Sequence, residues 1–293
     1  MSKLNLFLPD QNGIRATFDR EARRYDQHAV LEREVGSRLL DRLAFQRRVP
    51  ARIIDLGSGT GHCCAALKRR FRSAEVIGLD DSVAMSQALR NRSSFLYPLR
   101  AVCADLTLLP FADHSTDLLF SNLALQWCQD FSKLSEGLRR ILRPGGLLLF
   151  AILGPDSLKE FRLAGGYGPD SVLARRFPDM HDIGDTLLAA GFSEPVMDSE
   201  YITTEYRQFD TLVAELEATG ASTHFGDWAW QTREGTPLAA AYETLRRNGC
   251  YPVTWEIVYG AAFGPGEGQP IKTRQGDVAA FSVDYLRNSL PRR

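Results

Sequence analysis

Three glycines in a short segment could bring a ligand close to the backbone. They lie in "ARIIDLGSGTGHCC" at residues 51–64, where Gly57, Gly59 and Gly61 follow an apolar run. Glycine tolerates positive φ angles and has no side chain to hold a ligand away, so this spacing is typical of a tight turn between a strand and a helix. A dinucleotide-binding turn would need glycine where His62 stands. The glycines alone are therefore weak evidence for a phosphate ligand.

An acid stands just before these glycines, at Asp55. A carboxylate there would repel a pyrophosphate, but it would attract a ligand with an ammonium group, a positively charged sulfur and no phosphate. S-adenosylmethionine is such a ligand. We therefore expect a cofactor site for S-adenosylmethionine that includes Asp55, Gly57, Ser58, Gly59 and Gly61.

Two further acids end apolar runs. Asp80 closes "EVIGLD" and Asp105 closes "VCAD". Ligands of parallel sheets bind at the carboxyl ends of the strands, so we expect Asp80 to accept hydrogen bonds from the ribose hydroxyls and Asp105 one from the adenine amino group. Asp81 and Leu106, which directly follow these acids, belong to the same predicted site. A helix cap or a turn acid is the alternative for each position.

The elements that would position these residues alternate regularly. "AEVIGLD" and the fully apolar "LLLFAIL" suit parallel strands covered on both faces, and "HCCAALKRRF" and "DSVAMSQALRNR" are helical patterns, the latter with Asp81 or Ser82 as its N-cap. A further helix over Asp130–Leu142 should end at "RPGG". The order predicts an α/β fold with a doubly wound sheet.

Composition excludes several functions. The 293 residues carry 35 Lys and Arg against 36 Asp and Glu, so no overall field favours nucleic acid or an anionic membrane as a partner. The longest apolar run, Leu147–Leu153, is too short to span a bilayer, and the first residues lack a signal-peptide core. The five cysteines have no metal-ligand spacing. We expect a cytoplasmic protein without a metal site.

Together, "DLGSGTG", "GLD", "CAD" and "LRPGG" resemble the motifs of class I S-adenosylmethionine-dependent methyltransferases. The resemblance covers roughly residues 50–152. It implies a Rossmann-like, seven-stranded sheet whose last strand runs antiparallel, with "VTWEIVYGAAF" as a candidate for that strand.

The acceptor side of the reaction is indicated by "FSNLALQWC" at residues 120–128, which should place Asn122, Gln126 and Trp127 near the donor methyl. An aromatic ring beside a sulfonium contributes about 0.5–2 kcal/mol of cation–π attraction. No Ser/His/Asp or Cys/His arrangement is visible, so the nucleophile should belong to the substrate. A carboxylate, with a pKa near about 4, is already ionised at neutral pH and would only need alignment.

A closer resemblance extends beyond the glycine motif. "RRYDQHAVLEREV" (23–35), "RRFPDMHDIGDTLLAAGF" (175–192) and "PVTWEIVYG" (252–260) are similar to the malonyl-acyl-carrier-protein O-methyltransferases of biotin synthesis. The resemblance implies methyl transfer to the free carboxylate of a malonyl thioester on an acidic carrier protein. It also implies that Tyr25 faces the methyl or carboxylate and that Arg176 hydrogen-bonds the malonyl group.

This resemblance sets the expected organisation. We predict an N-terminal helical cap over residues 1–45 and a methyltransferase domain over residues 46–264, followed by a peripheral tail over residues 265–293. Glycine and proline predict an insertion at about 154–180, and helical patterns predict a helical insert at about 207–250.

Two other functions stay open. A methyltransferase for small free dicarboxylic acids would need no carrier. A methyltransferase-like assembly factor, similar to relatives that act on mitochondrial complex I, would bind a respiratory subunit and transfer no methyl to small acids.

The candidate carrier-docking patches are basic clusters. They are Arg69, Arg70 and Arg72; Arg139, Arg140 and Arg143; and Arg246 and Arg247.

Overall fold

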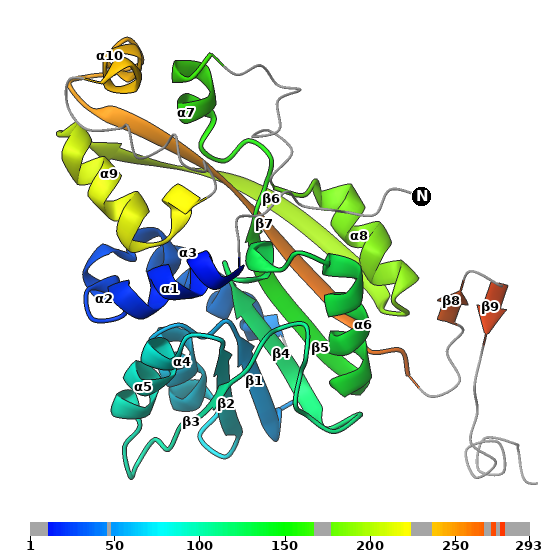
Figure 1. Cartoon of the computed structure of the whole chain (residues 1–293). Helices are drawn as coiled ribbons and strands as arrows, with labels where there is room; N and C mark the ends of the chain where they lie inside the picture. The colour runs from blue at the N-terminus through cyan, green and yellow to red at the C-terminus, as the bar shows by residue number, and fades with distance from the viewer. Residues whose placement is uncertain are drawn as a thin grey trace, which may run out of the picture.

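Seven strands form one mixed sheet in the computed structural model (Figure 1). The strand order is β3-β2-β1-β4-β5-β7-β6; β7 runs antiparallel to both neighbours, and the other pairs are parallel. The predicted fold, including the antiparallel strand at "VTWEIVYGAAF", is confirmed. The strands are β1 (Arg52–Leu56), β2 (Glu75–Asp80), β3 (Arg100–Cys103), β4 (Thr116–Asn122), β5 (Leu142–Leu153), β6 (Ser193–Tyr206) and β7 (Tyr251–Phe263).

The structure describes most of the chain. The described residues are 11–45, 48–166, 177–223, 236–266, 271–273 and 276–278.

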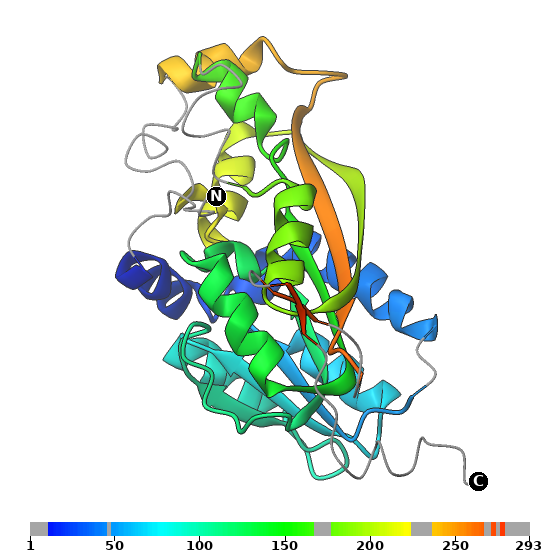
Figure 2. The same cartoon turned by 90° about the vertical axis from the view of Figure 1, so that its right-hand side faces the viewer.

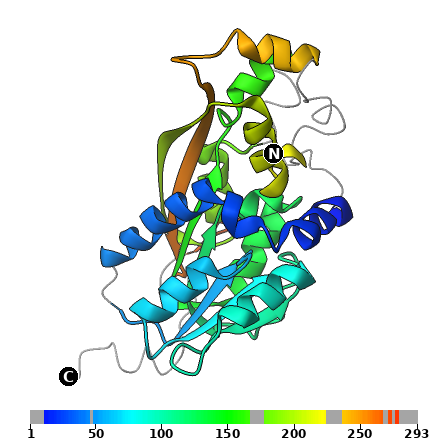
Figure 3. The same cartoon turned by 90° about the vertical axis from the view of Figure 1, so that its left-hand side faces the viewer.

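Helices cover both faces of the sheet. In Figure 2, α6 and α8 lie in front of the sheet. Figure 3 shows the molecule from the other side, and there α1 to α5 lie in front of the sheet. Three further helices pack on the far ends of β6 and β7 and are described below. The others are α1 (Gln11–Glu21), α2 (Tyr25–His28), α3 (Val30–Arg42), η1 (Leu43–Phe45), α4 (His62–Arg70), α5 (Val83–Arg92), η2 (Leu125–Trp127), α6 (Phe131–Ile141) and α8 (Met180–Ala189).

Alternation of apolar side chains builds a separate core on each face. Ile53 of β1 belongs to the cluster under α3 and α4, whereas its neighbour Ile54 belongs to the cluster under α6 and α8. Both side chains are fully buried. A strand buried on both faces reads as a continuous apolar run, which is why the sequence pattern identified β1.

The crevice of this sheet lies between β1 and β4. β1 pairs with β2 on one side and with β4 on the other, so the connections leave the carboxyl ends in opposite directions there. In open α/β sheets, ligands bind at such a switch point. The glycine loop after β1 and the segment after β4 therefore face the same space.

Two element boundaries differ from the sequence prediction. Helix α6 ends at Ile141, and β5 starts directly at Leu142 and includes "RPGG". This segment pairs with the end of β7, because Gly145 N donates to Gly264 O at 2.8 Å and Gly264 N donates to Gly146 O at 2.9 Å. At α5 the prediction is confirmed: Ser82, one of the two candidate N-caps, accepts from Met85 N at 3.1 Å.

Strands β6 and β7 extend beyond the rest of the sheet, and small helices pack on this extension (Figure 1). An aromatic cluster joins them: the rings of Phe161 and Tyr242 lie 4.8 Å apart, and those of Phe209 and Tyr242 lie 5.5 Å apart. Helices α9 and α10 lie within the segment at about 207–250 for which a helical insert was predicted. The helices are α7 (Lys159–Ala164), α9 (Phe209–Ala218) and α10 (Pro237–Glu243).

The tail contains a feature that the sequence did not suggest. Strands β8 (Ile271–Thr273) and β9 (Gly276–Val278) form a two-stranded antiparallel sheet. Of the predicted insertion, α7 and the residues around it are described, whereas residues 167–176 lie outside the described ranges.

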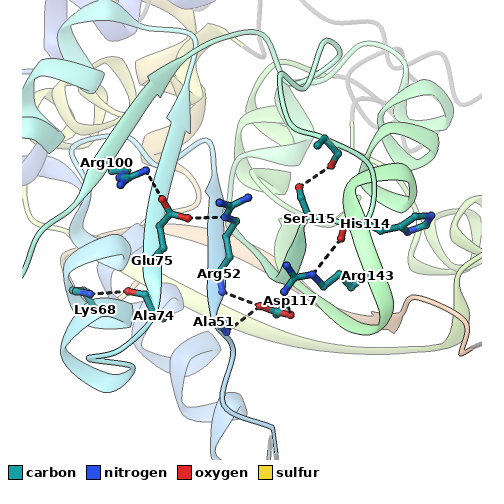
Figure 4. Close-up of polar contacts among 11 residues, drawn as sticks. Ala51, Arg52, Lys68, Ala74, Glu75, Arg100, His114, Ser115, Asp117 and Arg143 are labelled. Carbon is teal, nitrogen blue, oxygen red and sulfur yellow. Dashed lines mark hydrogen bonds and ion pairs between the residues drawn. The ribbon is translucent and has the colours of Figure 1, made fainter.

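Polar contacts fix the end of the sheet opposite the crevice (Figure 4). Asp117 of β4 accepts from Ala51 N at 2.9 Å and from Arg52 N at 2.8 Å, and its other oxygen accepts from Arg143 at 2.6 Å. Partial burial would raise the pKa of Asp117, but these hydrogen bonds hold it below its ordinary value. Asp117 thereby joins the starts of β1, β4 and β5.

We expect Asp117→Ala to lower the free energy of unfolding by about 1–3 kcal/mol, because two backbone N–H groups lose their acceptor. Urea denaturation would measure the loss. The matched control is Asp113→Ala, since Asp113 pairs with Arg140 at the surface with 65% of its side chain exposed, and such pairs contribute about 0–1 kcal/mol. Equal losses in both variants would contradict this role for Asp117.

Candidate active site

The glycine loop is held tightly between two neighbours. Gly57, Gly59 and Gly61 have φ angles of 64°, 53° and 84°, a region that side chains disfavour. A Cβ on Gly57 would lie 2.2 Å from Ala124 Cβ, and one on Gly61 would lie 2.7 Å from Leu89 Cγ. The loop can therefore fit between α5 and the segment after β4 only with glycine at positions 57 and 61.

This packing brings the loop backbone onto Asp80 at the end of β2. Gly59 N donates to Asp80 Oδ2 at 2.8 Å, and Ser82 N donates to Oδ1 at 3.0 Å. Burial raises the pKa of Asp80 to about 7, although these two N–H groups act in the opposite direction. Each carboxylate oxygen can accept a second hydrogen bond, so Asp80 keeps acceptor capacity for ligand hydroxyls.

Two adjoining cavities open at this edge of the sheet. The first, of about 170 Å³, extends from the glycine loop over Asp80 to Asp105. The second is smaller, about 50 Å³, and lies behind the loop around Asp55. Both cavities are lined by Tyr25, Gly57, Gly59 and Asn122.

Most of the predicted site residues converge on the first cavity. Besides the four shared residues, it is lined by Asp80, Asp81, Asp105, Leu106 and Trp127. Asp55 and Ser58 line the second cavity. Gly61 and Gln126 line neither of these cavities, and Arg176 lies outside the described residues.

Asp55 is almost fully buried, with 1% of its surface exposed. Cys64 Sγ donates to Asp55 Oδ2 at 3.1 Å. Burial raises the pKa of Asp55 to about 7, and nearby Asp80 adds to the rise. A positive charge in the cavity would lower that pKa again, because an opposite charge favours the ionised carboxylate.

Asp105 has a local partner as well as a place in the cavity. Its Oδ1 accepts from Thr107 N at 2.6 Å and from Thr107 Oγ1 at 2.8 Å. The alternative of a turn acid is therefore real, but it does not exclude ligand binding. Asp105 and Leu106 still line the cavity, and the second oxygen of Asp105 has no hydrogen bond to this turn.

Gln126 and Trp127 differ in orientation although they are adjacent in η2. Gln126 is 2% exposed, and its Nε2 donates to Leu123 O at 2.7 Å, so this side chain supports the turn. Trp127 faces the cavity and packs edge-to-face on Phe18 with ring centres 5.4 Å apart. Its carbonyl accepts from Gln11 Nε2 at 2.8 Å, which ties α1 to η2.

Tyr25 begins α2 and lies between the two cavities. Burial raises the pKa of its hydroxyl well above the ordinary value, and Glu32 and Asp80 add to the rise. The phenol therefore stays neutral near pH 7. It can offer an O–H or an aromatic ring, but it does not act as an anionic base.

Sequence reasoning missed the contribution of α1 and α3. Gln11, Ile14 and Phe18 of α1 line the first cavity, and Glu32 and Arg33 of α3 line the second. Ile14 and Phe18 are one helical turn apart, a spacing that marks an apolar face but does not tell whether that face covers core or ligand.

Among the described residues, no three His, Cys, Asp or Glu side chains come together as a metal site would require. Among these residues no helix has both the length and the apolar character needed to cross a bilayer.

Solved structures with the same arrangement show the fold alone. The YcgJ protein of Bacillus subtilis aligns with a TM-score of 0.54 at 16% identity, covering 77% of this chain and 97% of that one. The (4+2)-cyclase SpnF aligns with a TM-score of 0.51 at 20% identity, covering 80% of each chain.

Sequence relatives are much more specific. Residues 54–150 match the methyltransferase domain family. The malonyl-acyl-carrier-protein O-methyltransferase of Halorhodospira halophila is 44% identical over 283 residues, which cover 95% of this chain and 96% of that protein. The protein of the same name from Laribacter hongkongensis is 42% identical over 292 residues, with coverages of 94% and 97%. The chain is therefore a methyltransferase that belongs to the malonyl-acyl-carrier-protein O-methyltransferase family.

Proposed function

We propose that this protein transfers a methyl group from S-adenosylmethionine to the free carboxylate of malonyl-acyl-carrier protein, an early step of biotin synthesis. The donor would supply the methyl group and leave as S-adenosylhomocysteine, and an oxygen of the substrate carboxylate would be the nucleophile. The malonyl end loses one negative charge and becomes an ester. Such an apolar end could enter enzymes that exclude an ionised acid.

The acidic lining of the first cavity is the observation that supports S-adenosylmethionine as the methyl donor. Asp80, Asp81 and Asp105 line it, and no lysine, arginine or histidine is among its described lining residues. A pyrophosphate would meet only like charges there, whereas a cationic nucleoside without phosphate suits this wall. Burial raises the pKa of Asp81, as expected for an acid that has lost part of its hydration.

S-adenosylmethionine, when bound, would supply an electrophilic methyl group. Asp80 would accept from the ribose hydroxyls, and Asp105 and Leu106 would contact the adenine. The loop of Gly57, Ser58, Gly59 and Gly61 would let the ligand approach the backbone, with Asp55, Asp81 and Asn122 completing the proposed site.

The aromatic side of the cavity would contact the methyl and the acceptor. Trp127 and Phe18 form one wall, and Tyr25 stands 6.2 Å from Phe18 between ring centres. These rings would exclude water, and Tyr25 can donate a hydrogen bond to a carboxylate while it stays protonated. Alignment of an ionised acceptor with the methyl group could lower the activation free energy by about 7–11 kcal/mol in favourable cases. Gln126 would act by supporting the turn, and Arg176 as a malonyl ligand stays a prediction.

Several arginines of the candidate carrier-docking clusters already form ion pairs within the protein. Arg143 pairs with Asp117 and Arg140 with Asp113, at the end of the sheet opposite the cavity. Arg246 pairs with Glu243 and stacks on Tyr251. Because these arginines have structural partners, they are weaker candidates than the sequence alone suggested.

The acceptor can be tested with labelled donor. We expect a base-labile methyl ester on malonyl-acyl-carrier protein and much less on free malonate or other dicarboxylates, because the carrier adds binding energy. Comparable turnover of free dicarboxylates would favour the small-acid methyltransferase. Label on none of the acids, together with tight binding of a respiratory subunit, would favour the assembly factor.

A second prediction concerns Asp80. Asp80→Ala should weaken binding of S-adenosylhomocysteine by about 1–3 kcal/mol, because hydrogen bonds to a carboxylate are lost. Isothermal titration calorimetry would measure the affinity. Glu75→Ala is the control, since Glu75 lies at the other end of the same strand and pairs with Arg52 and Arg100. Unchanged affinity in Asp80→Ala would remove this residue from the donor site.

A third prediction separates donor binding from methyl transfer. Tyr25→Phe keeps the ring but loses the hydroxyl, so we expect kcat to fall by about tenfold or more while S-adenosylhomocysteine binds as before. Tyr97→Phe, in the loop before β3, serves as the control. If kcat is unchanged, the Tyr25 hydroxyl has no part in the reaction.

A further inference from the structure

The turn that follows helix α9 lies against the aromatic side of the first cavity. Its Gly220 has a φ angle of 76°, and an added Cβ there would lie 3.0 Å from Phe18 Cζ and 3.3 Å from Phe18 Cε1. Helices α1 and α9 are neighbours in space although they lie far apart in the sequence (Figure 1). Because Phe18 lines the first cavity, this contact joins the strand extension to the candidate active site.

The Phe18 ring contacts this turn and two other aromatic rings. Gly220 lies against the end of the ring that is farthest from the α1 backbone. The ring also packs edge-to-face on Trp127, with centres 5.4 Å apart, and its centre lies 6.2 Å from that of Tyr25. Trp127 and Tyr25 line the same cavity. A displacement of the free end of the Phe18 ring would therefore change the shape of the aromatic wall.

Hydrogen bonds hold Gly220 in place. Its N–H donates to Glu217 O at 3.2 Å, and its carbonyl accepts from Thr223 N at 3.0 Å and from Thr223 Oγ1 at 2.7 Å. Thr219, the C-cap of α9, donates to Glu215 O from both its N and its Oγ1, each at 3.0 Å. Because the turn is fixed in this way, a side chain at position 220 would have to displace the ring.

Helix α9 is anchored to the strand extension. Tyr206 Oη, at the end of β6, donates to Glu215 Oε1 at 2.6 Å. Leu212 and Leu216 of α9 are buried in the core cluster that also includes Tyr206. The position of the Phe18 ring therefore depends on an element that carries none of the predicted site residues.

Helix geometry gives a second reason for glycine at position 220. Helices often end in a residue with a positive φ angle, and glycine is favoured there whatever surrounds it. The ring contact adds a requirement, because every other residue type at this φ would carry a Cβ. Gly249 separates the two reasons: its φ is 80°, and in the described part of the chain an added Cβ there meets no heavy atom within 4 Å.

We propose that Gly220 is a positioning residue for methyl transfer, which acts through Phe18 to set the aromatic wall that the acceptor meets. The inference rests on the proposed function and assigns a part in the reaction to the turn after α9. A methyl group at position 220 would displace the free end of the Phe18 ring and disturb the alignment of the acceptor with the donor. A misplacement of about 1 Å can slow a reaction by about a hundredfold, so a smaller shift should still cost several-fold.

A double-mutant cycle tests the inference. We expect Gly220→Ala to lower kcat/KM for malonyl-acyl-carrier protein at least about fivefold in the wild-type background. In the Phe18→Leu background the same change should alter kcat/KM less than about twofold, because the shorter side chain leaves room for the added methyl group. S-adenosylhomocysteine should bind wild type and Gly220→Ala within about twofold of each other, since the proposed donor ligands lie away from this turn.

Gly249→Ala is the matched control, because it places a Cβ at nearly the same φ angle without a ring to displace. It should leave kcat/KM unchanged. Equal losses for Gly220→Ala in the two backgrounds would overturn the inference. A loss in Gly220→Ala no larger than that in Gly249→Ala would also overturn it, since backbone strain alone would then explain the effect.

Folding of the variants gives a further readout. If Gly220→Ala alone does not fold, its combination with Phe18→Leu should fold with a cooperative thermal transition, and failure of this double variant would contradict the ring contact. Wild-type protein that binds S-adenosylhomocysteine but methylates no malonyl-carrier would refute the proposed function. Normal transfer by wild type with equal losses in both backgrounds would refute only the role of Gly220.

Discussion

The close contact of the glycine loop with its two neighbours is the constraint on which the site depends. Gly57 lies against Ala124 after β4, and Gly61 lies against Leu89 of α5, with no room for a Cβ at either glycine. This contact places the Gly59 N–H on Asp80. If the loop moved outward by the width of a methyl group, Asp80 would lose this hydrogen bond and both cavities would change shape together.

The same packing buries three acids, none of which forms an ion pair with another described residue. Asp55, Asp80 and Glu32 each have a pKa raised to about 7, with burial as the main cause. A raised pKa means that the folded chain holds these protons more tightly than the unfolded chain. Their contribution to stability is present below about pH 4 and is lost as pH rises through about 7. A cationic ligand would offset this cost, so the site is adapted to binding at the expense of the free protein.

The sequence predicted the parts of this site that depend on local pattern. The loop glycines, Asp80 and Asp105 follow apolar runs, and strand ends of a parallel sheet meet at one edge, so their convergence could be expected. Glu32 could not be found in this way, because Asn122 and the backbone of Glu32 meet across 90 positions of sequence. Gln126 shows what such a pattern leaves out: the sequence places this residue after the strand end, but only the structure shows that its side chain donates to Leu123 O.

The sheet alone does not determine what is methylated, or whether anything is. SpnF has the same fold and is named a (4+2)-cyclase. What distinguishes this chain surrounds the sheet edge: α1 contributes Phe18 and α3 contributes Glu32 to the cavities, while the long β6 and β7 carry a separate aromatic cluster above them. Changes in these helices can alter the ligand without disturbing the loop packing. Specificity in this family should therefore depend on the N-terminal helices and the strand extension more than on the glycine motif that identifies the fold.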